Sequence, residues 1–100
     1  AWAYINIVQP VRIPTGFSPN GDGSNDFFFI PNLPQNFPDA EVLIFNRWGD
    51  EVWRSNGPYN NDWNGTNIQG NPLPDGTYFI RINFNEDDVD PYNGYVVIHR

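Results

Sequence analysis

The segment TYFIRINF, residues 77–84, carries the clearest structural pattern in the chain. Its even-numbered residues are all large and apolar: Tyr78, Ile80, Ile82 and Phe84. The residues between them are mixed, namely Phe79, Arg81 and Asn83. Because successive side chains of a strand point to opposite faces, this alternation predicts a half-buried β-strand. The segment YVVIHR, residues 95–100, follows an acidic turn region and predicts the second strand of a hairpin.

Another hairpin is predicted upstream of this pair. The segments EVLIFNR, residues 41–47, and EVWR, residues 51–54, are both rich in β-forming residues. The short connection between them predicts an antiparallel pair with Gly49 at positive φ. Arg47 and Trp48 are adjacent, and neighbours on a strand point to opposite faces, so we expect no cation–π contact between them.

Two further parts of the chain are expected to be extended. Residues 2–8 and 11–13 lie on either side of Pro10 and predict one strand with a bend. Residues 27–30 form a continuous apolar run, too short for a helix, which predicts a strand covered on both faces. The proline-rich residues 31–39 predict a loop with one helical turn.

The composition supports an all-β fold. Aromatic residues make up 17% of the chain, and ten Pro and nine Gly divide it into short segments, which favours strands and turns over helices. About seven short strands without a helical period predict an antiparallel immunoglobulin-like β-sandwich, with a small barrel as the alternative. One hundred residues are enough for one core, so we expect residues 1–100 to form a single domain.

Charge and composition exclude several classes of function. The formal net charge of −7 opposes binding to nucleic acid or to an anionic membrane surface. The chain has no cysteine, which leaves neither disulfides nor thiol chemistry. No apolar run approaches the ~18 residues of a membrane span, and the first residues lack a basic and hydrophobic leader. We therefore expect neither a membrane span nor a signal peptide in these residues.

The loop TGFSPNGDGSND, residues 15–26, combines turn formers with oxygen donors. It is interpreted either as a cluster of Asx turns or as a site for a hard cation such as Ca²⁺. Asn20, Asp22 and Asp26 are the candidate ligands for that ion. An EF-hand is excluded, because its twelfth position would fall on Phe29 instead of glutamate. No cofactor is required by any other pattern in the chain.

An enzymatic site is not indicated. His99 is the only histidine, and no serine or acid stands at a recognisable nucleophile spacing from it. The acidic run at residues 86–90 predicts a solvated hairpin turn. Four aromatic residues suit either a core or a sugar-binding platform. They are Trp48, Trp53, Tyr59 and Trp63. Tyr59 and Trp63 are the large anchors of the polar stretch at residues 55–75, so we expect that loop to be packed down.

Five ordered segments together resemble the gliding-motility-associated C-terminal domain, also called the type B sorting domain of the type IX secretion system. The segments are TGFSPNGDGSNDFF (15–28), LIFNRWGDEVW (43–53), YNNDWNG (59–65), LPDGTYFI (73–80) and GYVVIHR (94–100). The resemblance covers about residues 13–100. One departure is Asn64, where the family usually has aspartate, so a role for a carboxylate there is in doubt.

The resemblance implies a non-enzymatic sorting signal on a larger cargo protein. The cargo would pass through the periplasm of a Gram-negative bacterium and cross the outer membrane by the type IX machinery. It would then reach the cell surface or the medium. A PorP/SprF-like outer-membrane protein is the implied partner. A carbohydrate-binding β-sandwich and a structural spacer in an adhesin are the alternatives.

Recognition by such a partner requires a folded surface or an exposed strand, because no short linear motif stands out. The loop at residues 15–26 and the last strand are the expected contact surfaces. The candidate recognition residues are Ser18, Pro19, Asn20, Gly21, Asp22, Gly23, Asn25, Asp26, Arg47, Trp48, Gly49 and Arg100.

Overall fold

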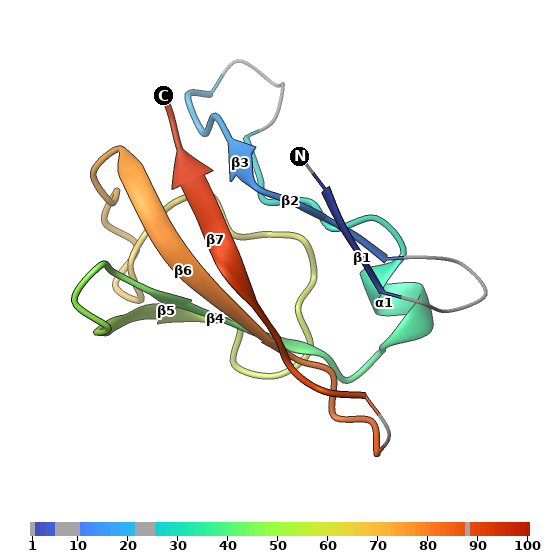
Figure 1. The fold of residues 1–100 in the computed structure, drawn as a ribbon. Helices are drawn as coiled ribbons and strands as arrows, with labels where there is room; N and C mark the ends of the chain where they lie inside the picture. The colour runs from blue at the N-terminus through green and yellow to red at the C-terminus, as the bar shows by residue number, and fades with distance from the viewer. Residues whose placement is uncertain (1, 6–10, 22–25, 88) are drawn as a thin grey trace.

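The computed structural model describes residues 2–5, 11–21, 26–87 and 89–100 (Figure 1). These residues form an all-β fold with one short helix, as the sequence predicts. The elements in chain order are β1 (Trp2–Ile5), β2 (Val11–Pro14), β3 (Gly16–Phe17), α1 (Leu33–Asn36), β4 (Glu41–Phe45), β5 (Glu51–Arg54), β6 (Gly76–Asn83) and β7 (Tyr92–Ile98). No helix in this described part is long and apolar enough to cross a membrane.

The main sheet contains five strands in the order β3-β7-β6-β4-β5. Both predicted hairpins are confirmed, since β4 pairs antiparallel with β5, and β6 pairs antiparallel with β7. Gly49 in the first hairpin has a φ of 86°, as expected for this connection. The strand β7 begins at Tyr92, earlier than predicted, and ends at Ile98, so His99 and Arg100 follow it.

The inner face of this sheet carries the core. The predicted alternation in β6 is confirmed, because Tyr78, Ile80 and Ile82 are buried while Phe79 is exposed. Neighbouring strands place their own apolar side chains on the same face: Val42, Ile44, Val96 and Ile98. The antiparallel pairing of β4 with β6 joins the two hairpins into one sheet, and the packing of these side chains buries its inner face.

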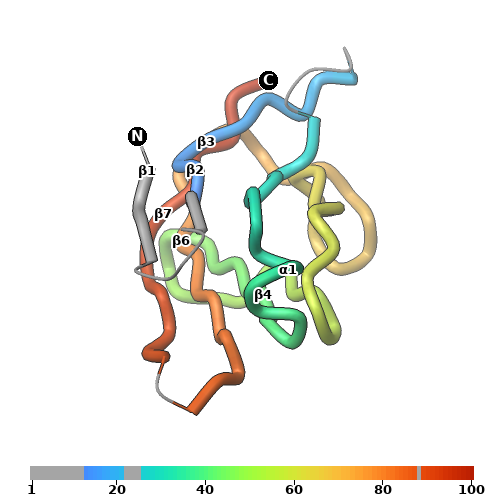
Figure 2. The backbone as a smooth tube through the Cα atoms, turned by 90° about the vertical axis from the view of Figure 1, so that its right-hand side faces the viewer, coloured from blue at the N-terminus to red at the C-terminus, as the bar shows by residue number. Residues whose placement is uncertain are grey.

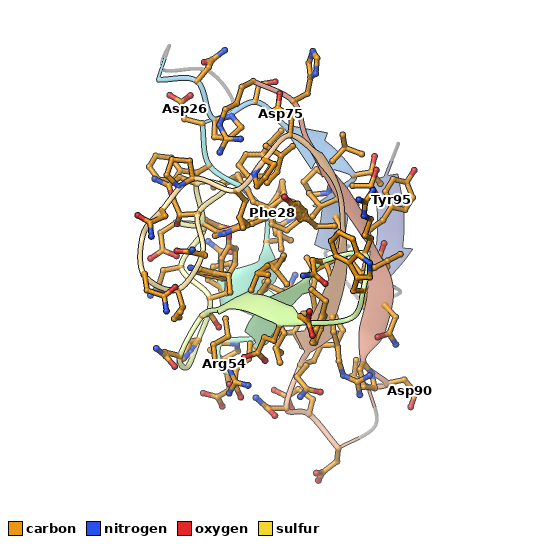
Figure 3. All side chains as sticks on the ribbon, turned by 90° about the vertical axis from the view of Figure 1, so that its left-hand side faces the viewer. Asp26, Phe28, Arg54, Asp75, Asp90 and Tyr95 are labelled. Carbon is orange, nitrogen blue, oxygen red and sulfur yellow. The ribbon has the colours of Figure 1, made fainter. Side chains whose placement is uncertain are left out.

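Loops, rather than a long second sheet, cover this inner face in the described residues. Figure 2 shows the segments 26–40 and 55–72 together on one side of β6 and β7. Trp63 and Tyr59 anchor the second segment in the core, as the sequence predicts. The ring of Trp63 lies 5.2 Å from that of Phe17 and 6.1 Å from that of Phe28. Figure 3 shows Phe28 within this packed interior.

The prediction of a strand at residues 27–30 was wrong. The segment pairs with no described strand, and its exposure alternates: Phe28 and Ile30 are buried, whereas Phe27 and Phe29 are exposed. Its backbone bonds to a loop instead, since the Phe28 amide donates to the Trp63 carbonyl at 2.8 Å. The Phe28 carbonyl accepts from the hydroxyl of Tyr59. These bonds satisfy the backbone without a sheet ladder.

The N-terminal prediction of one bent strand was also wrong. The strands β1 and β2 form a separate antiparallel pair, with Trp2 opposite Pro14 and Ile5 opposite Val11. Residues 6–8 of the predicted strand lie outside the described residues. The short strand β3 then runs parallel to β7, so the main sheet is mixed and not purely antiparallel. The described strands thus divide into a sheet of five and a pair.

Candidate recognition surface

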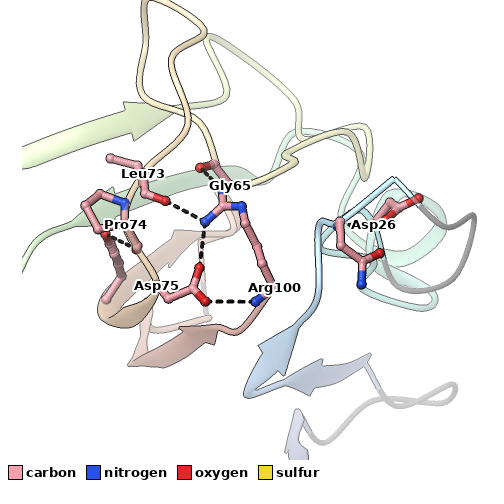
Figure 4. A network of polar contacts seen from close by, with 8 residues as sticks. Asp26, Gly65, Leu73, Pro74, Asp75 and Arg100 are labelled. Atoms are coloured by element: carbon pink, nitrogen blue, oxygen red, sulfur yellow. Dashed lines mark hydrogen bonds and ion pairs between the residues drawn. The ribbon is translucent and has the colours of Figure 1, made fainter.

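Arg100 joins two loops to the end of β7. Its guanidinium donates to the carbonyl oxygens of Leu73 at 2.6 Å and Gly65 at 3.2 Å, as Figure 4 shows. It also forms an ion pair with Asp75, whose Oδ1 lies 2.9 Å from Nη1. The planar guanidinium suits this arrangement, because its donors point in several fixed directions. We call Arg100, Gly65, Leu73 and Asp75 the arginine clamp.

Asp75 completes the arginine clamp with both of its carboxylate oxygens. While Oδ1 accepts from the Arg100 side chain, Oδ2 accepts from the Arg100 backbone amide at 3.0 Å. The backbone bond, and then the side-chain bond, lower the pKa of the Asp75 carboxyl below its ordinary value. The carboxylate is therefore held ionised, and the backbone just after β7 is held beside the loop that precedes β6.

We expect this carboxylate to make stability depend on pH in the acid range. Its pKa is depressed in the folded state, so its contribution is present above the unfolded pKa of about 4 and is lost as the pH falls through the lower folded pKa. In Asp75→Asn, this contribution is missing at every pH. Melting temperatures measured from about pH 7 down to about pH 2 should therefore converge for wild type and variant. A difference that stays constant over that range would contradict the assignment.

Gly65 brings the loop at residues 15–26 against the arginine clamp. Gly65 is buried with a φ of 81°, in the left-handed region that favours glycine. A Cβ atom at this position would lie 3.0 Å from Cγ of Pro19 and 3.1 Å from Nη2 of Arg100. Only a residue without a side chain fits between these two groups, so the loop and the clamp form one continuous surface.

Gly65→Ala should therefore destabilise the domain more than an alanine at another positive-φ glycine. Gly70 is a matched control, because its φ is 90° and nothing lies within 4 Å of a Cβ placed there. Alanine at either position is strained by the positive φ, but only in Gly65→Ala does the new Cβ atom also approach neighbouring atoms too closely. We expect its free energy of unfolding in urea to fall by about 1 kcal/mol more than that of Gly70→Ala. Equal losses would show that the close approach is unimportant.

The described part of the loop at residues 15–26 is closed by a carboxylate. Oδ1 of Asp26 accepts from the backbone amides of Asn20 at 3.2 Å and Gly21 at 2.9 Å. These amides lie five and six residues before Asp26, so the bonds close the loop and do not form an Asx turn, in which the bond runs to an amide two residues later. Asp22, Gly23 and Asn25 lie outside the described residues, so the Ca²⁺ site at Asn20, Asp22 and Asp26 stays a prediction.

A shallow hollow of about 220 Å³ lies beside this loop. It is lined by Pro19, Gly21, Asp26, Phe27 and Asn64. Asn64 accepts a hydrogen bond from the Thr66 hydroxyl through Oδ1 at 3.1 Å. The amide thus supports the local turn without a carboxylate. Ser18 lies at the other side of the same loop, where its carbonyl accepts from the Asn20 amide at 2.9 Å.

The turn between β4 and β5, residues 46–50, holds an aromatic side chain out in solvent. Oδ1 of Asn46 accepts from the amides of Trp48 at 3.0 Å and Asp50 at 2.9 Å. Trp48 is 72% exposed. The expectation of no contact between Arg47 and Trp48 was wrong, because the guanidinium carbon of Arg47 lies 4.3 Å from the Trp48 ring centre. Both residues follow the end of β4, so strand alternation no longer separates their side chains.

This turn also borders the arginine clamp. A hollow of about 250 Å³ separates them and is lined by both, with Arg47, Trp48 and Asn46 on one side and Pro74, Asp75, Gly76, Thr77 and Tyr78 on the other. The Tyr78 hydroxyl donates to the Pro74 carbonyl at 2.7 Å, which links two of the residues on the second side of the hollow. The structure therefore places three predicted residues, Arg47, Trp48 and Arg100, around Asp75. The loop at residues 15–21 adjoins the opposite side of the clamp through Pro19.

The sugar-platform interpretation fails for two of its four aromatic residues. Tyr59 and Trp63 are buried, and Trp53 is partly buried with its ring 5.8 Å from that of Trp63. Burial also raises the pKa of the Tyr59 hydroxyl, which stays protonated and bonded to the backbone. The rings of Tyr59 and Trp63 fill the core and present no open face. Trp48 is exposed, and Trp53 lines a hollow together with Ile68.

The sequence interpretation missed Gly65, Leu73 and Asp75 as parts of the surface. Leu73 and Gly65 act through their carbonyl oxygens, which every residue type possesses, so no residue pattern could indicate them. Asp75 lies in one of the resembling segments, as do Gly65 and Leu73, but the sequence assigned none of them a role. In the described part of the chain, no group of three or more His, Asp or Glu side chains could hold a metal ion.

These features define a class of protein: a small β-rich domain whose loops are joined to the end of its last strand by Arg100. The family comparison makes the class specific. The CHU_C type IX secretion signal domain model matches residues 11–98, and the chain belongs to this family. No curated protein matches the chain.

Family membership establishes the general role of the domain. It is a C-terminal sorting signal, recognised by the type IX secretion machinery, on a cargo that leaves a Gram-negative cell for its surface or surroundings. The family is not a catalytic one.

Proposed function

We propose that the type IX machinery recognises the surface formed by the arginine clamp, the loop at residues 15–21 and the turn at residues 46–50. A PorP/SprF-like protein of the outer membrane is the proposed receptor, and the cargo meets it from the periplasm. The observation that carries this proposal is the set of bonds from Arg100 to Gly65, Leu73 and Asp75. These bonds bring residues that are far apart in the chain together at one end of the molecule.

Such a surface exists only in the folded domain. Pro19, Gly65 and Arg100 are mutually close, although 35 residues separate Gly65 from Arg100. An unfolded chain would present none of these groups together. A receptor that binds this surface therefore selects cargo whose signal domain has folded. We also propose that the domain has the predicted immunoglobulin-like sandwich architecture. That architecture would hold the recognition surface in a fixed shape.

Trp48 is the proposed anchor of the contact. Buried aromatic anchors surrounded by polar groups dominate the energetics of many interfaces. Trp48 is exposed, its turn is fixed by Asn46, and its ring is stacked with Arg47. A side chain presented in a fixed position loses little conformational freedom on binding. The hollow beside it gives a partner side chain room to pack.

Trp48→Ala should weaken receptor binding without weakening the fold. Binding of the domain to a detergent-solubilised PorP/SprF-like protein is the measurement, by interferometry on immobilised receptor. We expect the dissociation constant to rise at least about tenfold. Ile68→Ala is the matched control, because Ile68 is a similarly exposed apolar residue but lies outside the proposed surface.

The control decides how the result is interpreted. If the two variants bind equally well, the anchor is not Trp48. If wild type itself shows no binding, the choice of receptor class is wrong. Circular dichroism of each variant, recorded in the same buffer, separates loss of binding from loss of the fold.

Carbohydrate binding is the second candidate, and the position of Trp48 favours it. The exposed ring borders a hollow that also contains Asp75 and Thr77, and an aromatic face with nearby polar groups suits a sugar ring. Titration with polysaccharides separates the candidates, since a sugar site predicts quenching of Trp48 fluorescence and a sorting signal does not. Ca²⁺ at the loop of residues 15–26 is a proposal that such titrations can include.

A further inference from the structure

The two edges of β7 are paired to different extents. On one side, β6 pairs with it along its full length, from Tyr92 opposite Ile82 to Ile98 opposite Gly76. On the other side, β3 pairs only with Val97 and Ile98, and Figure 1 shows it beside the last part of β7 alone. Among the described strands, none pairs with this second edge between Tyr92 and Val96.

The backbone groups on this open edge can be assigned from the bonds to β3. The Val97 amide donates to the Thr15 carbonyl at 2.9 Å, and the His99 amide donates to the Phe17 carbonyl at 3.2 Å. Backbone groups alternate in direction along a strand, so odd-numbered residues of β7 face this side. Asn93 and Tyr95 therefore direct their amide and carbonyl groups to the open edge. This gives two donors and two acceptors in one row.

The open stretch is short, but it lacks the other features that protect natural edge strands. Those features are bulges and the presence of lysine or proline. The sequence from Asn93 to Val97 contains neither lysine nor proline, and its register with β6 is continuous. The opposite edge of the sheet differs, because the Val52 carbonyl in β5 accepts from the Ile68 amide at 3.0 Å. The open part of β7 is thus a suitable site for an added strand.

The surroundings of this edge indicate the chemistry of the added strand. Tyr95, which Figure 3 labels, is opposite Phe79 in the ladder. The two side chains are 46% and 49% exposed, which offers an apolar surface beside the edge. Glu86, Asp87 and Asp90 are exposed in the turn that leads into β7. Their charge exceeds that of Arg81, which bonds to Asn93 at 3.3 Å on the same face. An apolar and basic strand complements this surface.

We propose that the edge of β7 from Asn93 to Tyr95 binds an extended, basic segment of the secretion machinery by β-strand addition. The inference rests on the sorting function and adds a second contact to the proposed surface around Arg100. Backbone hydrogen bonds supply the binding, while alternate side chains of the segment pack on Tyr95 and meet the acidic turn. The two contacts lie on one chain segment, because β7 leads directly to Arg100.

The test uses amide hydrogen exchange with synthetic peptides. The probe is an extended peptide that alternates lysine with valine, and its control alternates glutamate with valine. At a peptide concentration about ten times the dissociation constant, exchange of the Tyr95 and Asn93 amides should slow about tenfold with the basic peptide only. The Val96 amide points toward β6 and should change little, which provides an internal reference.

Two variants separate backbone bonding from side-chain packing. Tyr95→Pro removes the outward amide at a position where an edge strand tolerates proline, so peptide binding should be lost. Tyr95→Ala keeps the amide and should bind the basic peptide within a few-fold of wild type. Asn93→Pro is the second test of the edge if Tyr95→Pro fails to fold, as judged by circular dichroism.

Three results would overturn the proposal. They are an unchanged exchange rate at Tyr95 and Asn93, equal protection by the acidic peptide, and self-association of the domain through this edge in place of peptide binding. A reporter fused to the domain distinguishes this inference from the sorting function. If the reporter is exported normally with Tyr95→Pro, the edge is unnecessary but the signal stands; if wild type is not exported, the sorting function itself fails.

Discussion

Trp63→Ala should strongly destabilise the domain, because it removes the centre of the aromatic core. Trp63 is 1% exposed, and its ring contacts those of Phe17, Phe28 and Trp53. Its indole nitrogen also donates to the Thr66 carbonyl at 2.8 Å. Truncation of a buried tryptophan costs about 3–5 kcal/mol, which is a large part of the roughly 5–15 kcal/mol that stabilises a small domain.

Trp48→Ala is the matched control for this prediction. It removes the same side chain from a position that is 72% exposed, so we expect a change within about 0.5 kcal/mol. Urea unfolding followed by circular dichroism measures both variants. A similar midpoint for the two would show that the described packing around Trp63 is wrong.

Arg100→Ala should open the recognition surface and lower the stability by about 2 kcal/mol. It leaves the Gly65 and Leu73 carbonyls without their charged donor, and Asp75 without its ion pair. The ion pair with Asp75 is partly exposed and contributes little by itself, so most of the effect comes from the bonds to the two carbonyls. Thermal unfolding provides the measurement.

Arg100→Lys and Asp75→Asn test how the loss of stability divides between the bonds to the two carbonyls and the ion pair. Lysine keeps the charge but loses the planar set of donors, so Arg100→Lys should recover only a small part of the loss. Asp75→Asn should cost less than Arg100→Ala, because it leaves the bonds to Gly65 and Leu73 in place. If Arg100→Lys is as stable as wild type, charge alone is sufficient and the clamp geometry is unimportant.

The parts of the fold that could be predicted are those encoded locally. Alternation in residues 77–84 gave the strand and its buried face, and the short connection containing Gly49 gave the upstream hairpin. Tyr59 and Trp63 were recognised as anchors because large aromatic residues in a polar loop are usually packed down. In each case the structure is determined by interactions among residues that are close together in the sequence.

The parts that could not be predicted depend on distant contacts. Residues 27–30 have the composition of a strand, but the loop around Trp63 satisfies their backbone groups. The parallel pairing of β3 with β7 joins segments about eighty residues apart, and no local pattern specifies it. Arg100 was chosen from a family resemblance, whereas its partners are mainly backbone carbonyls and lie beyond any residue-based signal.

The central claim is that these residues form a folded sorting signal for type IX secretion. The most direct measurement is delivery of a periplasm-targeted fluorescent reporter with residues 1–100 fused to its C-terminus, in a bacterium with a type IX system and a PorP/SprF-like partner. We expect delivery to the surface or medium that depends on the secretion system and is lost with Trp63→Ala. Retention of the wild-type fusion in the periplasm, or equal delivery of the Trp63→Ala fusion, would contradict the claim.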